Sequence, residues 1–164
     1  MSKNDHQTPA LQIIEVFSDD KEQVHQASRF IHALLCELDA ENQQDYIFQK
    51  IEAVTSELLA MSKIWVFIAK VSDEFVGVIT LHECAAVYAN GIFGEISELY
   101  VLPEFRSEQA GEALIKRGKE LAKYKGWKRL EVGSPVELGI PRAFNFYKRI
   151  GFECTGQRLK LELD

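Results

Sequence analysis

Cysteine is scarce in this chain of 164 residues, which holds only Cys36, Cys84 and Cys154. An odd number of cysteines at these spacings matches neither a disulfide framework nor a metal-ligand motif along the chain. We therefore expect each cysteine to act as a small buried hydrophobic residue, and we expect a reducing, cytoplasmic location.

Long hydrophobic runs and an excess of basic residues are also absent. No apolar stretch reaches the roughly 20 residues of a membrane-spanning helix, and residues 1–10 lack the apolar core of a signal peptide. The net charge of −6 disfavours a protein that follows nucleic-acid phosphates. We expect neither a membrane nor a nucleic acid as partner, and the sequence leaves a homodimer open. The acidic balance is compatible with a cationic amine as acceptor.

The pattern of apolar residues predicts one mixed α/β domain over residues 11–164, after a disordered tail at residues 1–10. An Asp-x-x-Glu capping box, Asp19 to Glu22, predicts the start of the first helix. Helices are expected at 19–38, 47–61, 109–125 and 141–150, and strands at 11–17, 64–71, 75–81, 92–101 and 127–132, with one or two more at 152–163.

Two stretches of the chain carry the most chemical information. Residues 99–114, LYVLPEFRSEQAGEAL, indicate a buried strand, a proline stop, an arginine-led loop and then a helix. A loop that opens a helix offers unpaired backbone N–H groups and the positive end of the helix dipole, which suit a pyrophosphate. Residues 143–152, AFNFYKRIGF, place Tyr147 on a short helix that ends at Gly151.

Together these stretches resemble the GCN5-related N-acetyltransferases (GNAT), whose hallmarks are V-x-P-x-x-R-G-x-G-x-G and a downstream F-Y-x-x-x-G-F. The resemblance covers roughly residues 64–158. It implies a GNAT domain with a central, mostly antiparallel, twisted mixed sheet of six to seven strands, splayed between the fourth and fifth and flanked by about four helices. It also implies an acyltransferase that moves an acetyl group from acetyl-CoA to a primary amine of a small molecule or protein, by direct attack in a ternary complex.

The resemblance also implies where acetyl-CoA binds. The pantetheine arm would pair with the backbone at the end of the strand before the loop, and the loop would hold the pyrophosphate. The sequence departs from the family pattern here, because Ser107 and Gln109 replace two glycines and only Gly111 remains. The expected contacts are Leu99, Tyr100, Val101, Arg106, Ser107, Glu108, Gln109, Ala110, Gly111 and Glu112, with Ser134 and Asn145 as further candidates.

Catalysis by such an enzyme needs a proton donor and a base. By resemblance Tyr147 would protonate the departing thiolate, although it can equally fill the apolar face of its helix. The ammonium form of the acceptor must lose a proton before it attacks. Glu95, six residues before Val101, is the first candidate for the base, with Glu98 and Glu83 as rivals.

A catalytically idle relative is the alternative interpretation, because the loop glycines are lost. Such a protein would bind acyl-CoA or only a protein partner. The four histidines, His6, His25, His32 and His82, show no ligand spacing along the chain, so we expect no metal. The sequence does not identify the acceptor amine.

Overall fold

The computed structural model describes residues 10–106, 109–133, 141–156 and 158–163. The chain divides into two compact units, Met1–Glu131 and Val132–Asp164, and each is described here by itself. The single domain expected over residues 11–164 therefore stays a prediction. The expected tail at residues 1–9 and the candidate site residues Ser107, Glu108 and Ser134 lie outside the described residues.

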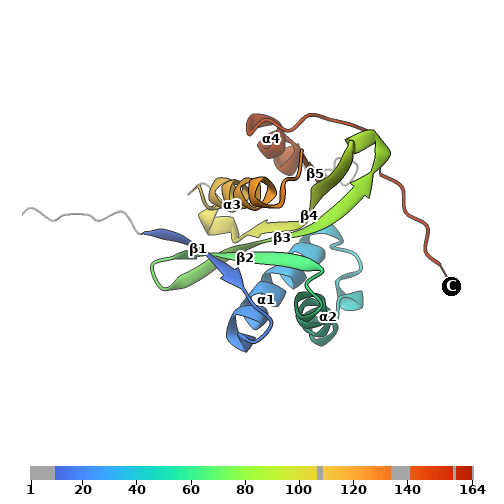
Figure 1. Ribbon diagram of the computed structural model, residues 1–164. Coiled ribbons are helices and arrows are strands. Elements are labelled where there is room, and N and C mark those ends of the chain that lie inside the picture. The colour runs from blue at the N-terminus through green and yellow to red at the C-terminus, as the bar shows by residue number, and fades with distance from the viewer. Residues whose placement is uncertain (1–9, 107–108, 134–140, 157, 164) are drawn as a thin grey trace, which may run out of the picture. The chain divides into compact units, whose positions relative to one another are not determined.

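A five-stranded sheet forms the centre of the first unit, with its strands in chain order (Figure 1). The first four strands pair antiparallel with their neighbours, and the fifth runs parallel to the fourth, so the sheet is mixed as expected. The strands are β1 (Leu11–Val16), β2 (Ile64–Val71), β3 (Glu74–Ala86), β4 (Gly91–Val101) and β5 (Leu130–Val132).

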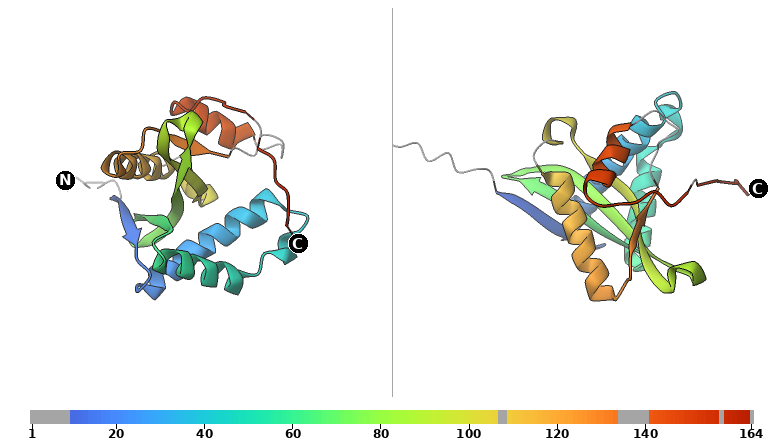
Figure 2. Two further views of the ribbon diagram at one scale, coloured as in Figure 1. Left: turned by 45° about the vertical axis from the view of Figure 1, so that its right-hand side comes forward. Right: turned by 90° about the horizontal axis from the view of Figure 1, so that it is seen from above.

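Helices cover both faces of this sheet. Helices α1 (Lys21–Leu38) and α2 (Phe48–Ala60) lie on one face, and α3 (Ala110–Lys125) lies on the other (Figures 1 and 2). Short 3-10 turns occur at Gln43–Asp45, Val87–Ala89 and Pro103–Phe105. Helix α4 (Pro141–Arg149) belongs to the second unit. Among the helices of the described residues, none is long and apolar enough to cross a membrane.

Helix α1 begins one residue later than the capping box predicted. The side chain of Asp20, rather than Asp19, accepts the backbone N–H of Gln23 at 3.0 Å. An N-cap aspartate accepts the backbone N–H of the residue three positions later in the chain. Asp19 and Asp20 each have a Glu or Gln at that position, so both match the capping-box pattern. Both choices place the same apolar side chains toward the sheet.

The core on one face of the sheet forms between the alternating apolar side chains of the strands and the apolar face of α1. Alternate residues of β2 and β3 point toward α1, which presents apolar residues every three or four positions. On the opposite face, Gly118 of α3 lets the helix approach β3, because a Cβ there would lie 3.2 Å from the side chain of Leu81. The buried residues on the α1 face include Val24, Ala27, Phe30 and Ile31 of α1 and Val66, Ile68 and Val78 of the sheet.

Gly94 allows the sheet to extend from β4 to β5. Its N–H donates to the carbonyl of Arg129 at 3.1 Å, and a Cβ on Gly94 would collide with the Trp127 ring and lie 2.7 Å from Leu130. The indole N–H of Trp127 donates to the carboxylate of Glu83 at 2.7 Å. Trp127 therefore packs against β4 at Gly94, where the strand has no side chain.

The strands expected at residues 152–163 are the main difference from the sequence analysis. The described residues of this segment contain no strand, and the described sheet has five strands rather than six or seven. Leu159, Leu161 and Leu163 alternate with charged residues, as in a strand, but they are 84% to 92% exposed. Alternation alone does not make a strand, because a strand needs a neighbour to pair with and a face to bury.

We predict that Gly94→Ala destabilises the fold by about 1–3 kcal/mol, because the added methyl forces the Trp127 ring away from β4. The matched control is Gly133→Ala, where the Cβ would approach only the movable end of the Arg158 side chain at 3.0 Å. Urea unfolding of both variants checks this. Equal midpoints for the two variants would contradict the packing argument.

Candidate active site

A β-bulge between β3 and β4 determines which side chains share a face of the sheet. Glu95 lies opposite His82 and Glu98 lies opposite Thr80, and the register shifts between them so that Ser97 is the extra residue. Residues three apart in a regular strand point to opposite faces. Here Thr80 and His82 share a face, so their partners Glu98 and Glu95 share it as well.

Glu98 forms a close pair with Thr80. The Thr80 hydroxyl donates to the Glu98 carboxylate and accepts the backbone N–H of Glu98 at 3.0 Å. Burial raises the pKa of Glu98, whereas the hydrogen bond from Thr80 and the charge of His82 lower it, and burial is the largest effect. A carboxylate with a raised pKa is a stronger base near neutral pH. Glu98 therefore stays a candidate for the base.

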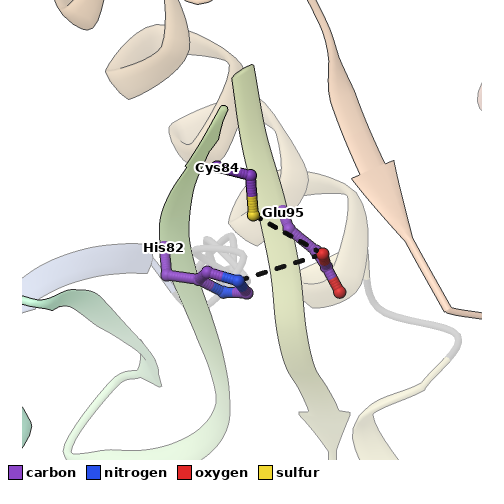
Figure 3. Close-up of side chains that lie close together, drawn as sticks. All are labelled: His82, Cys84 and Glu95. Carbon is purple, nitrogen blue, oxygen red and sulfur yellow. Dashed lines mark hydrogen bonds and ion pairs between the residues drawn. The ribbon is translucent and has the colours of Figure 1, made fainter. Parts of the chain in front are cut away.

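Glu95 is buried, with 8% of its surface exposed, and contacts two side chains of β3 (Figure 3). Its carboxylate oxygen Oε2 lies 3.7 Å from the Sγ of Cys84 and 3.9 Å from the Nε2 of His82. The other ring nitrogen of His82, Nδ1, lies 2.7 Å from the Ser97 hydroxyl. The first candidate base thus lies in a polar cluster rather than alone on the strand.

His82 and Cys84 were not selected by the sequence analysis. Their spacing, two residues apart in a strand, puts both side chains on one face, and this signal is visible in the sequence. The contact with Glu95 depends on the pairing register of β3 and β4, which the sequence does not reveal. Neither Cys36 nor Cys84 is fully buried and Cys154 is exposed, so the expectation of three buried cysteines is wrong.

Glu83, the third candidate base, is separated from the other two. It stands between His82 and Cys84 on β3 and therefore points to the opposite face of the sheet. Its carboxylate accepts the hydrogen bond from the Trp127 indole. The structure brings Glu95 and Glu98 together and leaves Glu83 on the face covered by Trp127.

Arg106 holds the end of β4, the segment Leu99, Tyr100 and Val101 to which the sequence analysis assigned the pantetheine arm. Its Nε donates to the carbonyl of Val101 at 2.7 Å, and its Nη2 donates to the carboxylate of Glu37 in α1 at 2.5 Å. The guanidinium also lies over the Tyr100 ring, 5.3 Å from its centroid. Arg106 therefore connects the strand end to α1.

The start of α3 keeps the backbone shape that a glycine would provide. Gln109 has φ 63° and ψ 1°, in the left-handed region, and no side chain caps the helix there. The first N–H groups of a helix have no acceptor within it. Ala110 is buried, Gly111 is half-buried and Glu112 is exposed in this first turn. The position that lost its glycine has kept a glycine-like conformation.

Tyr147 lies in the second unit, on α4. It is 9% exposed, and its ring packs edge-on against Phe146 and Phe152, with centroids 5.4 Å away in each case. Burial raises the pKa of the Tyr147 phenol well above its usual value, so the hydroxyl keeps its proton at neutral pH. Asn145, two residues earlier, is exposed on another side of the helix.

Comparison with known proteins identifies the family. Residues 62–154 match the family model of the Acetyltransferase (GNAT) domain. The chain is 30% identical over 123 residues to the aminoalkylphosphonate N-acetyltransferase of Salmonella typhimurium (strain LT2), covering 75% of this chain and 77% of that protein. The chain therefore belongs to the GNAT acetyltransferases and is an acyltransferase, which confirms the resemblance found in the sequence.

Solved structures agree on the fold. An aminoglycoside acetyltransferase from an uncultured soil metagenomic sample superposes with a TM-score of 0.74 at 19% identity, covering 94% of this chain and 95% of that one. A GCN5-related N-acetyltransferase from Ralstonia eutropha JMP134 gives 0.72 at 21% identity, with 93% and 99% covered. At these identities the likeness concerns the fold alone.

We predict that Gln109→Gly leaves the fold equally stable or stabilises it by up to about 1 kcal/mol. A left-handed non-glycine residue costs roughly 1–2 kcal/mol, which exceeds the roughly 0.5–1 kcal/mol of extra chain entropy that glycine loses on folding. Gln109→Val should instead destabilise by about 1 kcal/mol or more, because a β-branched residue is strained at positive φ. Thermal unfolding measures both, and a less stable glycine variant would show that the Gln109 side chain itself stabilises the loop.

Proposed function

We propose that this chain is an N-acetyltransferase that moves the acetyl group of acetyl-CoA to a primary amine by direct attack in a ternary complex. The observation that carries the proposal is the bulge in β4, which sets the carboxylates of Glu95 and Glu98 on one face of the strand that leads into α3. Two acidic side chains suit a cationic amine, and either can take the proton that the amine must lose.

The base acts first. An alkylammonium with a pKa of roughly 10 is protonated at neutral pH and has no lone pair for attack. Glu95 is our first candidate to accept the proton, directly or through a water molecule, because it is buried beside His82 and Cys84. Glu98 is the alternative, and burial raises the pKa of its carboxyl.

The cosubstrate, when bound, supplies the acetyl thioester. Two features of the first unit support its binding beside β4. The left-handed Gln109 opens the N-terminus of α3 with backbone N–H groups suited to a pyrophosphate. In addition, β5 has three residues and β4 has eleven, so β5 can pair along only part of β4, the part around Gly94. We assign the backbone of residues 99–101 to the pantetheine arm, with Arg106 fixing this strand end.

Tyr147 is the proposed proton donor for the departing thiolate. Its buried phenol stays protonated, which a donor requires. A phenol, with an ordinary pKa of about 10, is already a weaker acid than a thiol, whose pKa is about 8.5. Burial raises the pKa of Tyr147 further and widens this difference. Tyr147 can therefore act by hydrogen bonding to the sulfur as negative charge develops there, and the proton moves only in a closely aligned complex.

A small amine is the acceptor that we favour. The Salmonella relative carries aminoalkylphosphonate in its name, and a fold neighbour is an aminoglycoside acetyltransferase. Both names denote small molecules with primary amines. The carboxylates of Glu95 and Glu98 on β4 suit the ammonium group of either molecule. The screen should therefore hold aminoalkylphosphonates, aminoglycosides and a lysine peptide.

We predict that acetyl-CoA stabilises the folded protein. A ligand at about a hundred times its dissociation constant adds roughly 2.7 kcal/mol to the free energy of unfolding, which raises Tm by roughly 5–10 °C for a chain of this size. Gln109→Gly should show an equal or larger shift, because it removes a Cβ beside the phosphates. Differential scanning fluorimetry with acetyl-CoA, and with adenosine as control, measures this. No shift at millimolar acetyl-CoA would refute cosubstrate binding.

We predict that Tyr147→Phe lowers kcat by about a hundredfold or more and leaves the acetyl-CoA shift unchanged. The substitution removes one hydroxyl and keeps the ring that packs on Phe146 and Phe152. An interaction that matters mainly in the transition state affects turnover rather than binding.

The matched control is Tyr124→Phe, which removes a hydroxyl from a side chain that is 87% exposed and should not change the rate. Free thiol release is followed with the best amine from the screen. Equal kcat for the two phenylalanine variants would leave water as the proton source. A protein that binds acetyl-CoA but acetylates no amine in the screen would favour the catalytically idle alternative.

A further inference from the structure

Three side chains of β3 and β4 direct potential metal ligands toward one point (Figure 3). His82 offers Nε2, Cys84 offers Sγ and Glu95 offers a carboxylate oxygen, and these atoms all lie within 4.8 Å of one another. The two β3 residues alternate along one strand, and Glu95 faces His82 directly across the sheet. The ligands thus come from paired strands of the central sheet, which hold them in place without a metal.

The distances are close to those of a coordinated zinc ion. Zinc bonds of about 2.3 Å to sulfur and 2.0–2.1 Å to nitrogen or oxygen, at tetrahedral angles, place the ligand atoms roughly 3.3–3.5 Å apart. Here the Glu95 oxygen lies 3.7 Å from the Cys84 sulfur and 3.9 Å from the His82 nitrogen. The third pair, the His82 nitrogen and the Cys84 sulfur, lies within 4.8 Å. Side-chain rotations that move these atoms by about 1 Å or less would therefore complete the geometry.

The orientation of His82 also suits a metal ligand. A metal-binding histidine usually donates its second ring N–H to a neighbouring acceptor, which fixes the tautomer and the ring plane. Nδ1 of His82 lies 2.7 Å from the Ser97 hydroxyl. In the tautomer that donates Nδ1–H to Ser97, Nε2 carries a lone pair and faces the Glu95 carboxylate. Without a cation, this lone pair and the Glu95 carboxylate repel each other. A cation placed between them would bind both.

We propose that His82, Cys84 and Glu95 bind a divalent cation of the zinc type, and that this cation reversibly inhibits acetyl transfer. The sulfur and nitrogen ligands select zinc over magnesium or calcium, which prefer oxygen. Binding releases the thiol proton of Cys84 to solvent as the Zn–S bond forms. Three protein ligands leave one coordination position for water.

Inhibition rests on the proposed function, because it follows from the role of Glu95. A carboxylate that binds zinc cannot accept the proton of the ammonium group. The cation and the cationic amine should also exclude each other from this face of β4 by charge repulsion. Zinc is therefore expected to act against the amine acceptor and not against acetyl-CoA.

Cobalt(II) is the spectroscopic probe for the site. We expect one equivalent of Co²⁺ to give visible bands of tetrahedral cobalt and a thiolate-to-cobalt charge-transfer band, both abolished by Zn²⁺. Cys84→Ala should lose the charge-transfer band and bind Zn²⁺ at least tenfold more weakly, since even the loss of a residue that only orients a ligand costs about 10–100-fold. His82→Gln should weaken binding similarly.

Cys36→Ala is the matched control. The Sγ of Cys36 also lies near a histidine nitrogen, 3.7 Å from Nε2 of His32, and is half-buried like that of Cys84. The control should keep the cobalt spectrum, the zinc affinity and the acetyl-transfer rate. A spectrum lost in Cys36→Ala and kept in Cys84→Ala would overturn the assignment.

Alkylation of the unmodified protein tests the site if a variant fails to fold. Saturating Zn²⁺ should slow the reaction of iodoacetamide with Cys84 at least tenfold, the lower end of the roughly 10–100-fold effect on metal affinity used above. The reaction at Cys36 and Cys154 should not change. Peptide mass spectrometry measures the alkylation of each cysteine. Equal rates at Cys84 with and without zinc would refute the site in the native chain.

Kinetics separate the site from the inhibition. Zn²⁺ should raise the apparent KM for the amine, and EDTA should restore the rate. Cys84→Ala should need at least tenfold more zinc for half-inhibition. Each protein is compared with its own rate in the absence of zinc. Zinc that binds without slowing turnover would overturn the inhibition alone. If no amine is acetylated, the proposed function fails while the cobalt and alkylation results still decide the metal site.

Discussion

The pairing of β3 with β4 around one extra residue, Ser97, is the constraint on which the candidate site depends. In a regular antiparallel pair, Glu95 and Glu98 would point to opposite faces of the sheet, one toward α1 and the other toward α3. The bulge moves both to the α1 face. Thr80 spans the shift, since its hydroxyl accepts the Glu98 N–H and donates to the Glu98 carboxylate. One side chain thus satisfies the backbone group that the bulge displaces and positions a candidate base.

The rest of β4 is held by contacts of different kinds along its length. Near its start, Gly94 lets Trp127 pack on the strand and gives its N–H to Arg129, which brings β5 alongside. At its end, Arg106 binds the Val101 carbonyl and reaches Glu37 of α1. The strand is therefore fixed at both ends, and the backbone between them keeps a defined position relative to the first turn of α3.

Most of the fold was predictable because periodicity is a local property of the sequence. The bounds of β1, β2 and α3 agree with the expected ranges to within one residue. Gly126 ends α3 in the left-handed conformation, which glycine commonly adopts after a helix. The missing final strand shows the limit of this reasoning. Leu159, Leu161 and Leu163 have the pattern of a strand, but pairing is a tertiary property that no local pattern guarantees.

The candidate site was predictable only in part, and for a related reason. The resemblance to the family selected Glu95, Arg106, Gln109 and Tyr147 as candidates, because these residues stand at fixed distances along the chain from the family's motifs, and their roles stay predictions. The partners of Glu95 came from the register of β3 against β4, and spacing along the chain does not reveal a cross-strand contact. The separation of Glu83 from the other two carboxylates follows simply from alternation, once β3 is known to continue to Ala86.

The surroundings of Glu95 connect the two roles that we propose for it, proton acceptor and metal ligand. A base needs a carboxylate that is shielded from bulk water yet open to its substrate, and 8% exposure with an imidazole and a thiol nearby provides this. The same three groups offer nitrogen, sulfur and oxygen lone pairs at coordination distance. An ammonium group and a zinc ion would then use the same electron pair of Glu95. In this proposal the concentrations of free zinc and of the amine decide which of them binds, so the chemistry that would make Glu95 a base would also make it sensitive to zinc-type cations.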